Sequence, residues 1–492
     1  MPPFSARRVA SSPDIVGTHE SGVERIPTSR RIPAASPHKR ESQAKLAVAR
    51  ARANREIERR RIYLGEGLTV RLRAEGFEVD AEAVDLTPEG MGVAVAEGAP
   101  LPVAGDELVV VHTGRATRGI EQRAIVTHVG EGTFAGKKYA RLGLCFVSEP
   151  PSSRSVVNRR RAERYECPEA FPALASANSP LFFREWLHFR MRDVGAGGMT
   201  VATSLRNKGL IRGLELTFSV TLPLIGVFEV RGKIASIRRA SSSNEYRLGI
   251  RFVDAPKTFV RAVSEYLMLG DKRLTPARLR KGGFEVGSVE RAVSYDYAST
   301  PADYEAVLEL RLRAHQAEGR LENLTTADMA SSFDAHARHL TCRFGGRVVG
   351  YVRVIYVDGS PSRSQYVSKG GHEVPEWLWK AGFVEAGAGA MDPEFQRAGL
   401  FVPMMQHAVR VALQSGYRYM LGACSDELLA MYQDMGFTHV ETRMVSPRPG
   451  WQFQSHLICI DMENLLRAPP QGKSVEAMAS VVTFVGQFDD GT

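Results

Sequence analysis

Cysteines are few and scattered in this sequence, and long apolar runs are missing. The 492 residues include five cysteines: Cys145, Cys167, Cys342, Cys424 and Cys459. No two have the spacing of metal ligands, and an odd, scattered set argues against a disulfide framework. We therefore expect buried thiols in a reducing compartment and no metal site. No run approaches the ~20 apolar residues that a membrane helix needs, and no signal-peptide core is visible near the start. These absences predict a cytoplasmic protein.

A surplus of acidic residues is also missing, because the formal net charge is +9 and the pI is about 9.3. This balance permits an anionic partner such as a nucleotide, a membrane surface, nucleic acid or an acidic carrier protein. The length predicts about three domains at roughly 150 residues each. Hydrophobic residues make up 43% of the chain, which is enough for sizeable cores.

The basic excess is partly concentrated before residue 62. We predict that residues 1–54 form a disordered basic tail ending in a basic lead-in helix, since Ser, Pro and Arg dominate the first 40. Contact of this helix with a membrane surface is one interpretation, and a solvated helix is the favoured one. Nucleic acid is not expected as a partner. Residues 468–492 are predicted to be a flexible tail.

An internal repeat follows the N-terminal tail. "AVDLTPEGMGVAV" (83–95) parallels "MRDVGAGGMTVAT" (191–203), and "YARLGLCFV" (139–147) parallels "EYRLGIRFV" (245–253). Both copies consist of short alternating apolar runs separated by turn residues, which is typical of antiparallel strands. We predict two small antiparallel β-barrels, at 55–150 and 151–270.

The stretch "RDVGAGGMTV" (192–201) raises the question of what its three glycines do. Glycines between two alternating runs predict a tight hairpin turn. Upstream stands "NRRRAERYECP", with Arg160 and Arg164 four residues apart. Together the two stretches resemble the R-x-x-x-R and [DN]-x-S-x-x-G motifs of PilZ domains, over residues 158 to 268.

The resemblance implies a site for cyclic di-GMP on the second barrel. Arg160 and Arg164 would hold guanine and phosphate, since arginine suits both. Asp193 and Gly198 would shape the second motif. Gly195 stands where the family has serine, which removes one possible hydrogen bond, worth roughly 1 kcal/mol. The glycine turn would then also line a nucleotide site.

The first barrel carries a weaker version of these motifs. "DLTPEG" (85–90) keeps a hydroxyl at Thr87, but Arg61 has Ile57 four residues before it. The pair Arg55 and Arg59 lies two residues out of register with the strand start. We predict a degenerate PilZ-like barrel that does not bind the nucleotide.

From about residue 288 the pattern changes to alternating strands and helices, which predicts a mixed α/β domain over 288–467. "RHLTCRFGGRVVGYVRVIYVD" predicts a hairpin around Gly345 and Gly346, and "VPMMQHAVRVALQSG" an amphipathic helix. "RYMLGAC" predicts a buried strand and "ELLAMYQDMGF" a second helix. The fold class is therefore α+β multidomain, with two small antiparallel barrels followed by a mixed α/β domain.

Two stretches of this domain resemble GNAT acyltransferases. The loop Gln396-Arg397-Ala398-Gly399-Leu400-Phe401 is similar to their Q/R-x-x-G-x-G/A loop, whose backbone N–H groups bind the donor's phosphates. "MYQDMGF" (431–437) is similar to the Tyr-x-x-x-Gly-Phe end of the following helix. The resemblance makes these six loop residues the acyl-donor site and the domain a GNAT-like acyltransferase.

Phe401 stands where that family has Gly or Ala, and its ring is expected to crowd a pyrophosphate. A donor with a single phosphate on a phosphopantetheine arm is expected to be crowded less by this ring. The layout over residues 295 to 465 also resembles N-acyl amino acid synthases of the FeeM type. That resemblance implies transfer of a long acyl chain from acyl carrier protein to an amino acid. "VPEWLWKAGF" (374–383) supplies material for an acyl tunnel or for the core.

For the chemistry, Glu385 is the candidate base and Tyr432 the candidate acid that protonates the leaving thiolate. Backbone N–H groups of the strand that carries Glu385 would polarise the thioester carbonyl. His372, His407 and His456 are alternatives without a visible partner in the sequence. The leading hypothesis is a cyclic di-GMP-responsive N-acyltransferase. A GNAT acetyltransferase that uses acetyl-CoA, or a non-catalytic cyclic di-GMP effector, stays open.

Overall fold

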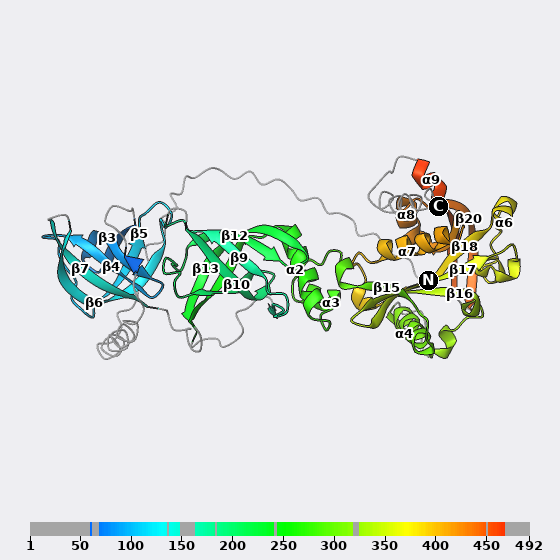
Figure 1. Ribbon diagram of the computed structural model, residues 1–492, viewed down its shortest axis with the longest axis horizontal. Coiled ribbons are helices and arrows are strands. Elements are labelled where there is room, and N and C mark those ends of the chain that lie inside the picture. The colour runs from blue at the N-terminus through cyan, green and yellow to red at the C-terminus, as the bar shows by residue number, and fades with distance from the viewer. Residues whose placement is uncertain are drawn as a thin grey trace, which may run out of the picture.

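The computed structural model describes residues 60–61, 68–134, 137–147, 163–182, 185–240, 244–317, 324–448 and 451–467. These residues form two β-barrels and a mixed α/β domain, arranged in a row (Figure 1). The predictions for the basic tail, its lead-in helix and the segment 468–492 lie outside the described residues. No helix in the described part of the chain has the length and apolar character to cross a membrane.

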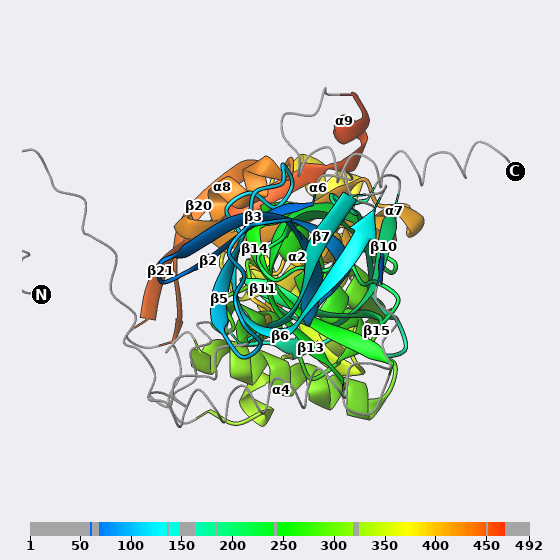
Figure 2. The ribbon, with the colours of Figure 1, turned by 90° about the vertical axis from the view of Figure 1, so that its left-hand side faces the viewer.

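The first barrel is a closed ring of six antiparallel strands in the order β3-β2-β5-β6-β7-β4, with β4 returning to β3. Figure 2 looks at it from its free side. A short strand, β1 (Arg60–Arg61), pairs with β3 outside the ring. The ring strands are β2 (Thr69–Ala74), β3 (Phe77–Thr87), β4 (Gly90–Ala96), β5 (Glu107–His112), β6 (Glu121–Phe134) and β7 (Lys137–Phe146). Alternate residues such as Val70 and Leu72 point inward, as the period of two requires.

The second barrel repeats this topology, which confirms the repeat seen in the sequence. Its ring order is β10-β9-β12-β13-β14-β11, closed by pairing of β11 with β10, and β8 (Tyr165–Glu166) pairs with β10. The ring strands are β9 (Leu174–Asn178), β10 (Trp186–Gly195), β11 (Gly198–Ser204), β12 (Glu215–Leu222), β13 (Gly226–Arg239) and β14 (Glu245–Asp254).

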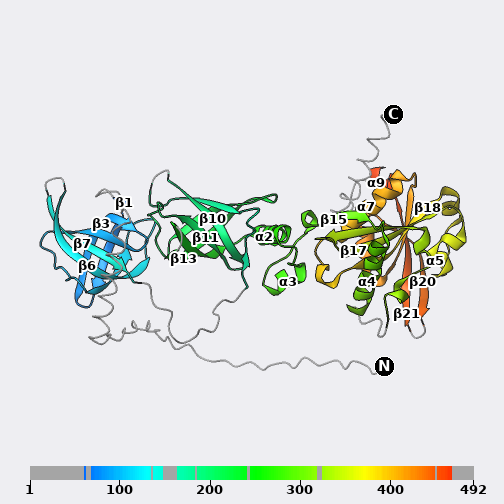
Figure 3. The ribbon, with the colours of Figure 1, turned by 60° about the horizontal axis from the view of Figure 1, so that its bottom comes forward.

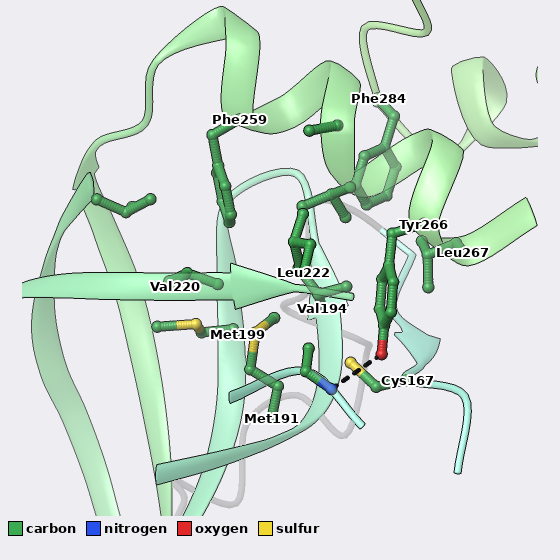
Figure 4. Close-up of a cluster of buried hydrophobic side chains, with 14 of the residues drawn as sticks. Cys167, Met191, Val194, Met199, Val220, Leu222, Phe259, Tyr266, Leu267 and Phe284 are labelled. Carbon is green, nitrogen blue, oxygen red and sulfur yellow. Dashed lines mark hydrogen bonds between the residues drawn. The ribbon is translucent and has the colours of Figure 1, made fainter. Parts of the chain in front are cut away.

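A helix that the sequence patterns did not single out, α2 (Lys257–Gly270), packs against the second barrel. Phe259 and Tyr266 point from it into the barrel core, among Met191, Val194 and Met199 (Figure 4). The Tyr266 hydroxyl accepts a hydrogen bond from the backbone N–H of Ala173 at 3.1 Å. The buried aromatic surface and this bond fix the helix to the barrel.

A connector leads from α2 to the third domain. It contains the short helix α3 (Pro276–Lys281), whose N-cap Thr275 accepts a hydrogen bond from the backbone N–H of Arg278. Proline at the first helical position and glycine after the last are the usual end signals. The 3-10 helix η2 (Glu290–Ala292) follows. In Figure 3 the connector lies between the second barrel and the mixed domain.

The third domain is a seven-stranded mixed sheet in the order β15-β16-β17-β18-β19-β21-β20. Its strands are β15 (Ser294–Tyr297), β16 (Ala337–Phe344), β17 (Arg347–Val357), β18 (Phe383–Met391), β19 (Tyr419–Ser425), β20 (Thr438–Arg448) and β21 (Trp451–Asp461). Its helices are α4 (Pro301–Ala317), α5 (Gln365–Ser368), α6 (Glu376–Ala381), α7 (Phe401–Gln414), α8 (Asp426–Asp434) and α9 (Met462–Arg467). The hairpin at Gly345 and Gly346 and the predicted helices α7 and α8 are confirmed.

The only parallel pairing in the described sheets joins β18 to β19, and it is short. It ends at Glu385 opposite Leu421, whereas β18 continues to Met391 and β19 to Ser425. Beyond that pair the two strands separate, which leaves backbone groups on their facing edges without ladder partners.

Candidate functional site

The predicted nucleotide motifs of the second barrel meet in space. Strands β10 and β11 form a hairpin in which Gly195 pairs with Gly198, so the glycine stretch is the tight turn that the sequence predicts. Just before the turn, Asp193 Oδ1 accepts a hydrogen bond from Arg164 Nη1 at 2.7 Å. The same nitrogen is 2.7 Å from Thr200 Oγ1. Both charged side chains are part-exposed, so a ligand can reach them. Arg160 lies outside the described residues.

The absence of a side chain at Gly195 has a steric cause. A Cβ built there would lie 2.8 Å from the carbonyl oxygen of Glu163. At Gly198 a Cβ would lie 2.3 Å from the carbonyl oxygen of Ile250. Real Cβ atoms are not found so close to a backbone oxygen, so the segment that carries Arg164 packs directly on the turn. A serine at 195 would push this segment away.

Strand pairing corrects the register that the sequence suggested for the first barrel. Arg60 pairs with Leu86, and Tyr165 pairs with Val194, the equivalent position in the second barrel. Position 59 therefore corresponds to Arg164, and position 55 to Arg160. The argument that Arg55 and Arg59 are out of register was wrong, because the strand begins at Arg60, two residues earlier than the apolar pattern indicates. In the described part of the motif, Asp85 forms an ion pair with Arg141 at 2.6 Å.

A cavity of about 490 Å³ lies between the two barrels. The first barrel contributes Pro88 of its motif turn together with Phe146 and Arg123. The second contributes three cations: Arg212, Lys233 and Arg251. In the first barrel the corresponding positions hold Ala104, Ile125 and Cys145. Because Arg251 pairs with Gly198, the cavity adjoins the motif turn of the second barrel.

The predicted donor loop connects β18 to α7. Gln396, Arg397 and Gly399 are exposed, whereas Ala398 and Leu400 are buried and anchor the loop. Arg397 and Gly399 have φ angles of 58° and 69°, in the left-handed region. The loop ends at the start of α7, where backbone N–H groups have no partner within the helix. This is the geometry in which a phosphate group binds.

Phe401, the first residue of α7, faces Tyr432 of α8. The two rings meet edge to face with centroids 5.6 Å apart. Tyr432 also packs on Phe437 at 5.3 Å. The two predicted site elements therefore come together between α7 and α8. Burial raises the pKa of Tyr432, as does, to a smaller extent, the nearby thiol of Cys424. The hydroxyl thus keeps its proton at neutral pH, as a general acid must.

Strand β18 contains an irregular stretch at the opening toward β19. Its pairing with β17 shifts register between Tyr351 and Arg353, and Ala388 has a φ of 51°. One extra residue on β18 forms a bulge flanked by Gly387 and Gly389. Such a bulge turns backbone N–H groups away from the ladder. These groups are the ones that we predicted would polarise a thioester carbonyl.

Glu385 lies fully buried at the last position of β18 that pairs with β19. Its Oε1 accepts a hydrogen bond from the Ser364 hydroxyl, and its Oε2 accepts one from the backbone N–H of Gln365 at 2.9 Å. Burial raises the pKa of Glu385 to about 7, against the smaller lowering by these hydrogen bonds and by Arg353. Because Glu385 is fully buried, a proton from solvent or substrate reaches this carboxylate through a neighbouring group such as the Ser364 hydroxyl.

Tyr366 is a residue of the site that sequence reasoning missed. It projects from α5, and its hydroxyl donates to the carbonyl oxygen of Ala386 at 2.6 Å. Ala386 is the first residue of β18 beyond the parallel pairing, so this hydroxyl lies at the strand opening. Burial raises the pKa of Tyr366, and the nearby carboxylate of Glu385 raises it further. The surrounding sequence "SQYVSKGG" has no helical periodicity, and a single aromatic residue in it gives no signal for a functional site.

The three histidines do have partners, contrary to the sequence reading. His372 contacts Glu441 at 3.2 Å and Ser455 at 3.1 Å. His456 Nε2 lies 2.6 Å from Asp426 Oδ1. His407 stacks on Tyr295 with ring centroids 4.4 Å apart. The two partners of His372 and the Asp426 partner of His456 lie 30 to 83 residues away in the chain, so no local pattern could reveal them.

The segment 374–383 contains α6, and two of its residues, Leu378 and Phe383, are buried. Leu378 is fully buried, and the Trp379 ring contacts Phe383 at 5.1 Å. Trp377 remains 52% exposed. Part of the segment therefore belongs to the core, and the exposed Trp377 ring lies beside Tyr419.

Replacing Glu385 with glutamine tests the carboxylate directly. If Glu385 accepts the proton, the rate of the wild-type enzyme rises with pH through about 7, the pKa of this group, because only the ionised form is a base. The variant should show a lower rate and lose this rise. The measurement is a pH profile of kcat/KM. An unchanged rise in the variant would assign the base to another group.

Stability gives an independent readout of the same carboxylate. Its pKa is higher in the folded than in the unfolded chain, so its contribution to stability is present below the unfolded value and is lost as pH rises through about 7. Glu385→Gln should remove this loss in thermal unfolding scans between pH 5 and 8.

Two closed antiparallel barrels followed by a mixed sheet with helices are the architecture expected of PilZ-like barrels joined to a GNAT-like domain. Comparison with known families agrees. The model for the PilZ domain matches residues 158–269, and the model for the N-acyl amino acid synthase FeeM matches residues 306–460. Along the chain, the PilZ match therefore precedes the FeeM match.

Three solved structures illustrate the similarity of fold. FeeM, an N-acyl amino acid synthase from uncultured soil microbes, is 15% identical, with 34% of this chain and 90% of that chain covered and a TM-score of 0.28. YcgR in complex with c-di-GMP from Escherichia coli is 18% identical, with 43% and 84% covered and a TM-score of 0.18. The ribosomal-protein-S18-alanine N-acetyltransferase from Escherichia coli is 14% identical, with 34% and 92% covered and a TM-score of 0.26. No curated protein matches the chain.

Proposed function

We propose that this protein is a cyclic di-GMP-responsive N-acyltransferase that moves a long acyl chain from acyl carrier protein to the amine of an amino acid. The observation that carries the proposal is the meeting of the donor loop, Phe401 and Tyr432 at the start of α7, within the region that the FeeM model matches. The domain boundaries that we propose are 55–150, 151–270 and 288–467.

The proposed reaction is a direct transfer. The amine nitrogen attacks the thioester carbonyl carbon, and backbone N–H groups near the β18 bulge stabilise the negative charge on the carbonyl oxygen. The carbon–sulfur bond then breaks, and the thiolate takes its proton from the Tyr432 hydroxyl. The proton lost by the amine passes through a neighbouring hydroxyl, such as Ser364, to Glu385.

For the regulatory part, the proposal is that Arg160 and Arg164 close over cyclic di-GMP bound at the Asp193–Gly198 turn. Arg164 already lies at this turn, 2.7 Å from Asp193. The cations of the neighbouring cavity, Arg212 and Arg251, pair with no carboxylate among the described residues and would attract the dianionic ligand. Partners of the protein are thus cyclic di-GMP, acyl carrier protein and an amino acid.

The donor preference separates this proposal from an acetyltransferase that uses acetyl-CoA. We expect the full chain to use long-chain acyl carrier protein in preference to acetyl-CoA, because the Phe401 ring fills space next to the donor loop. Phe401→Gly should improve the use of acyl-CoA relative to acyl carrier protein. The measurement is the ratio of kcat/KM for the two donors. A wild-type preference for acetyl-CoA would replace the synthase by the acetyltransferase.

A matched control is Phe395→Leu, a buried ring beside the same loop that packs on Phe344 rather than on Tyr432. It should leave the donor ratio unchanged. An equal change of the ratio in both variants would show that loop packing in general, rather than the Phe401 ring, sets donor choice.

A further inference from the structure

The donor loop rests on the connector from the second barrel as well as on its own domain. Arg280 of α3 donates from Nη2 to the carbonyl oxygen of Gln396 at 2.8 Å. The backbone N–H of Val289 donates to the carbonyl oxygen of Ala398 at 3.1 Å. A Cβ at Gly399 would lie 3.0 Å from Ser288. The loop is therefore held along its length by residues outside the FeeM match.

Arg280 bonds to the carbonyl oxygen of Gln396, the residue directly before Arg397, so this contact brings two arginines near each other. Burial lowers the pKa of Arg280, and the positive charge of Arg397 lowers it further. Neither guanidinium forms an ion pair with a carboxylate within the described ranges. Like charges next to each other without a counter-charge are unfavourable unless an anion binds between them. The loop that carries Arg397 is the one expected to hold the donor's phosphate.

We propose that Arg280, together with Arg397, binds the phosphate of the acyl donor's phosphopantetheine arm. Arg280 lies in α3, in the connector between the second barrel and the mixed domain, and its guanidinium reaches the loop from there. A planar guanidinium can bind a phosphate with two N–H groups at once. This inference rests on the proposed function, because it takes the loop at 396–401 to be the donor site.

The other side of α3 contacts the nucleotide motif. The Tyr165 hydroxyl shares its proton between Glu163 Oε2 at 3.0 Å and the carbonyl oxygen of Arg278 at 3.3 Å. Arg278 Nη2 lies 3.8 Å from Glu163 Oε1. The Tyr165 ring packs on Phe284 with centroids 5.7 Å apart. Glu163 and Tyr165 are the two neighbours of Arg164 in the chain. A shift of this segment when Arg164 binds its ligand therefore moves α3, and with it Arg280.

The binding test uses the full chain and two probes, phosphopantetheine and pantetheine, which differ only by the phosphate. The wild-type protein should bind phosphopantetheine about tenfold tighter or more, since a charge-assisted pair is worth roughly a factor of ten. Arg280→Ala should remove most of this preference, and Arg280→Lys should restore part of it. The control is Lys281→Ala, an exposed cation on the same helix. Isothermal titration calorimetry gives the two dissociation constants for each variant.

Each outcome decides a separate point. If the phosphate preference is intact in Arg280→Ala, the role of Arg280 is overturned and the donor loop stands. If the wild-type protein shows no phosphate preference, the donor-loop assignment fails as well. In turnover assays Arg280→Ala should raise KM for the acyl donor about tenfold and change kcat less than twofold. A fall in kcat with an unchanged KM would contradict a binding role.

The coupling is tested by adding saturating cyclic di-GMP. It should shift the dissociation constant for phosphopantetheine in the wild-type protein, and Tyr165→Phe should reduce the shift because it removes the hydrogen bond to α3. A shift of the same size in Tyr165→Phe, or none in the wild type, would overturn the coupling.

Discussion

Replacing Tyr432 with phenylalanine is expected to lower turnover about 100-fold or more, the usual scale for a lost general acid. The ring contacts with Phe401 and Phe437 remain in the variant, so the packing between α7 and α8 should survive. Only the hydroxyl is lost, and with it the proton for the leaving thiolate. The measurement is kcat with acyl carrier protein as donor, together with thermal unfolding to check the fold.

Tyr417→Phe is the matched control for this experiment. Tyr417 is another part-buried tyrosine of the domain, packed on Tyr356 at 5.5 Å. Its variant should retain full turnover. If Tyr432→Phe also does, Tyr432 is not the acid, and Tyr366 at the strand opening becomes the next residue to test.

Arg164→Ala should abolish binding of cyclic di-GMP to the second barrel. Arg164 is part-exposed at the glycine turn, and its removal takes away both a phosphate ligand and the bond that fixes Asp193. Isothermal titration calorimetry on the full chain measures the loss. Arg206→Ala, an exposed arginine of the same barrel away from the turn, should bind as the wild type does.

The same experiment tests whether the protein binds cyclic di-GMP at all. If the wild-type chain gives no heat signal at about 100 µM cyclic di-GMP, which corresponds to roughly −5.5 kcal/mol, the nucleotide does not regulate this protein at useful concentrations. If binding is only halved in Arg164→Ala, the first barrel holds a second ligand. The corrected register of positions 55 and 59 makes that outcome informative.

Much of the candidate site could be predicted because its parts are local. The hairpin at Gly195–Gly198, the donor loop before α7 and the helix that carries Tyr432 each occupy a short window with clear turn or helix signals. Their roles still await the experiments above. The strand register of the first barrel and the hydrogen-bond partners of the histidines were harder to predict. The start of β1 was misplaced because two arginines, rather than apolar residues, form it.

The histidine partners and Tyr366 could not be predicted for a related reason. Each depends on which faces of separate elements come together, and alternation along one strand does not encode that. Glu385 shows the same limit. The sequence placed it on a central strand, but only the packing of α5 over that strand buries it, engages both its oxygens and raises its pKa to about 7.

The sequence by itself determined the order of the domains, the repeat, the glycine turn and the two stretches that resemble a donor site. Periodicity and turn chemistry act over a few residues, so they survive in the sequence alone. The tertiary structure decided the strand register of the first barrel, the opening between β18 and β19 and the contact of Arg280 with Gln396. That contact joins residues 116 positions apart, and it forms only because α2 and α3 pack the second barrel against the acyltransferase domain.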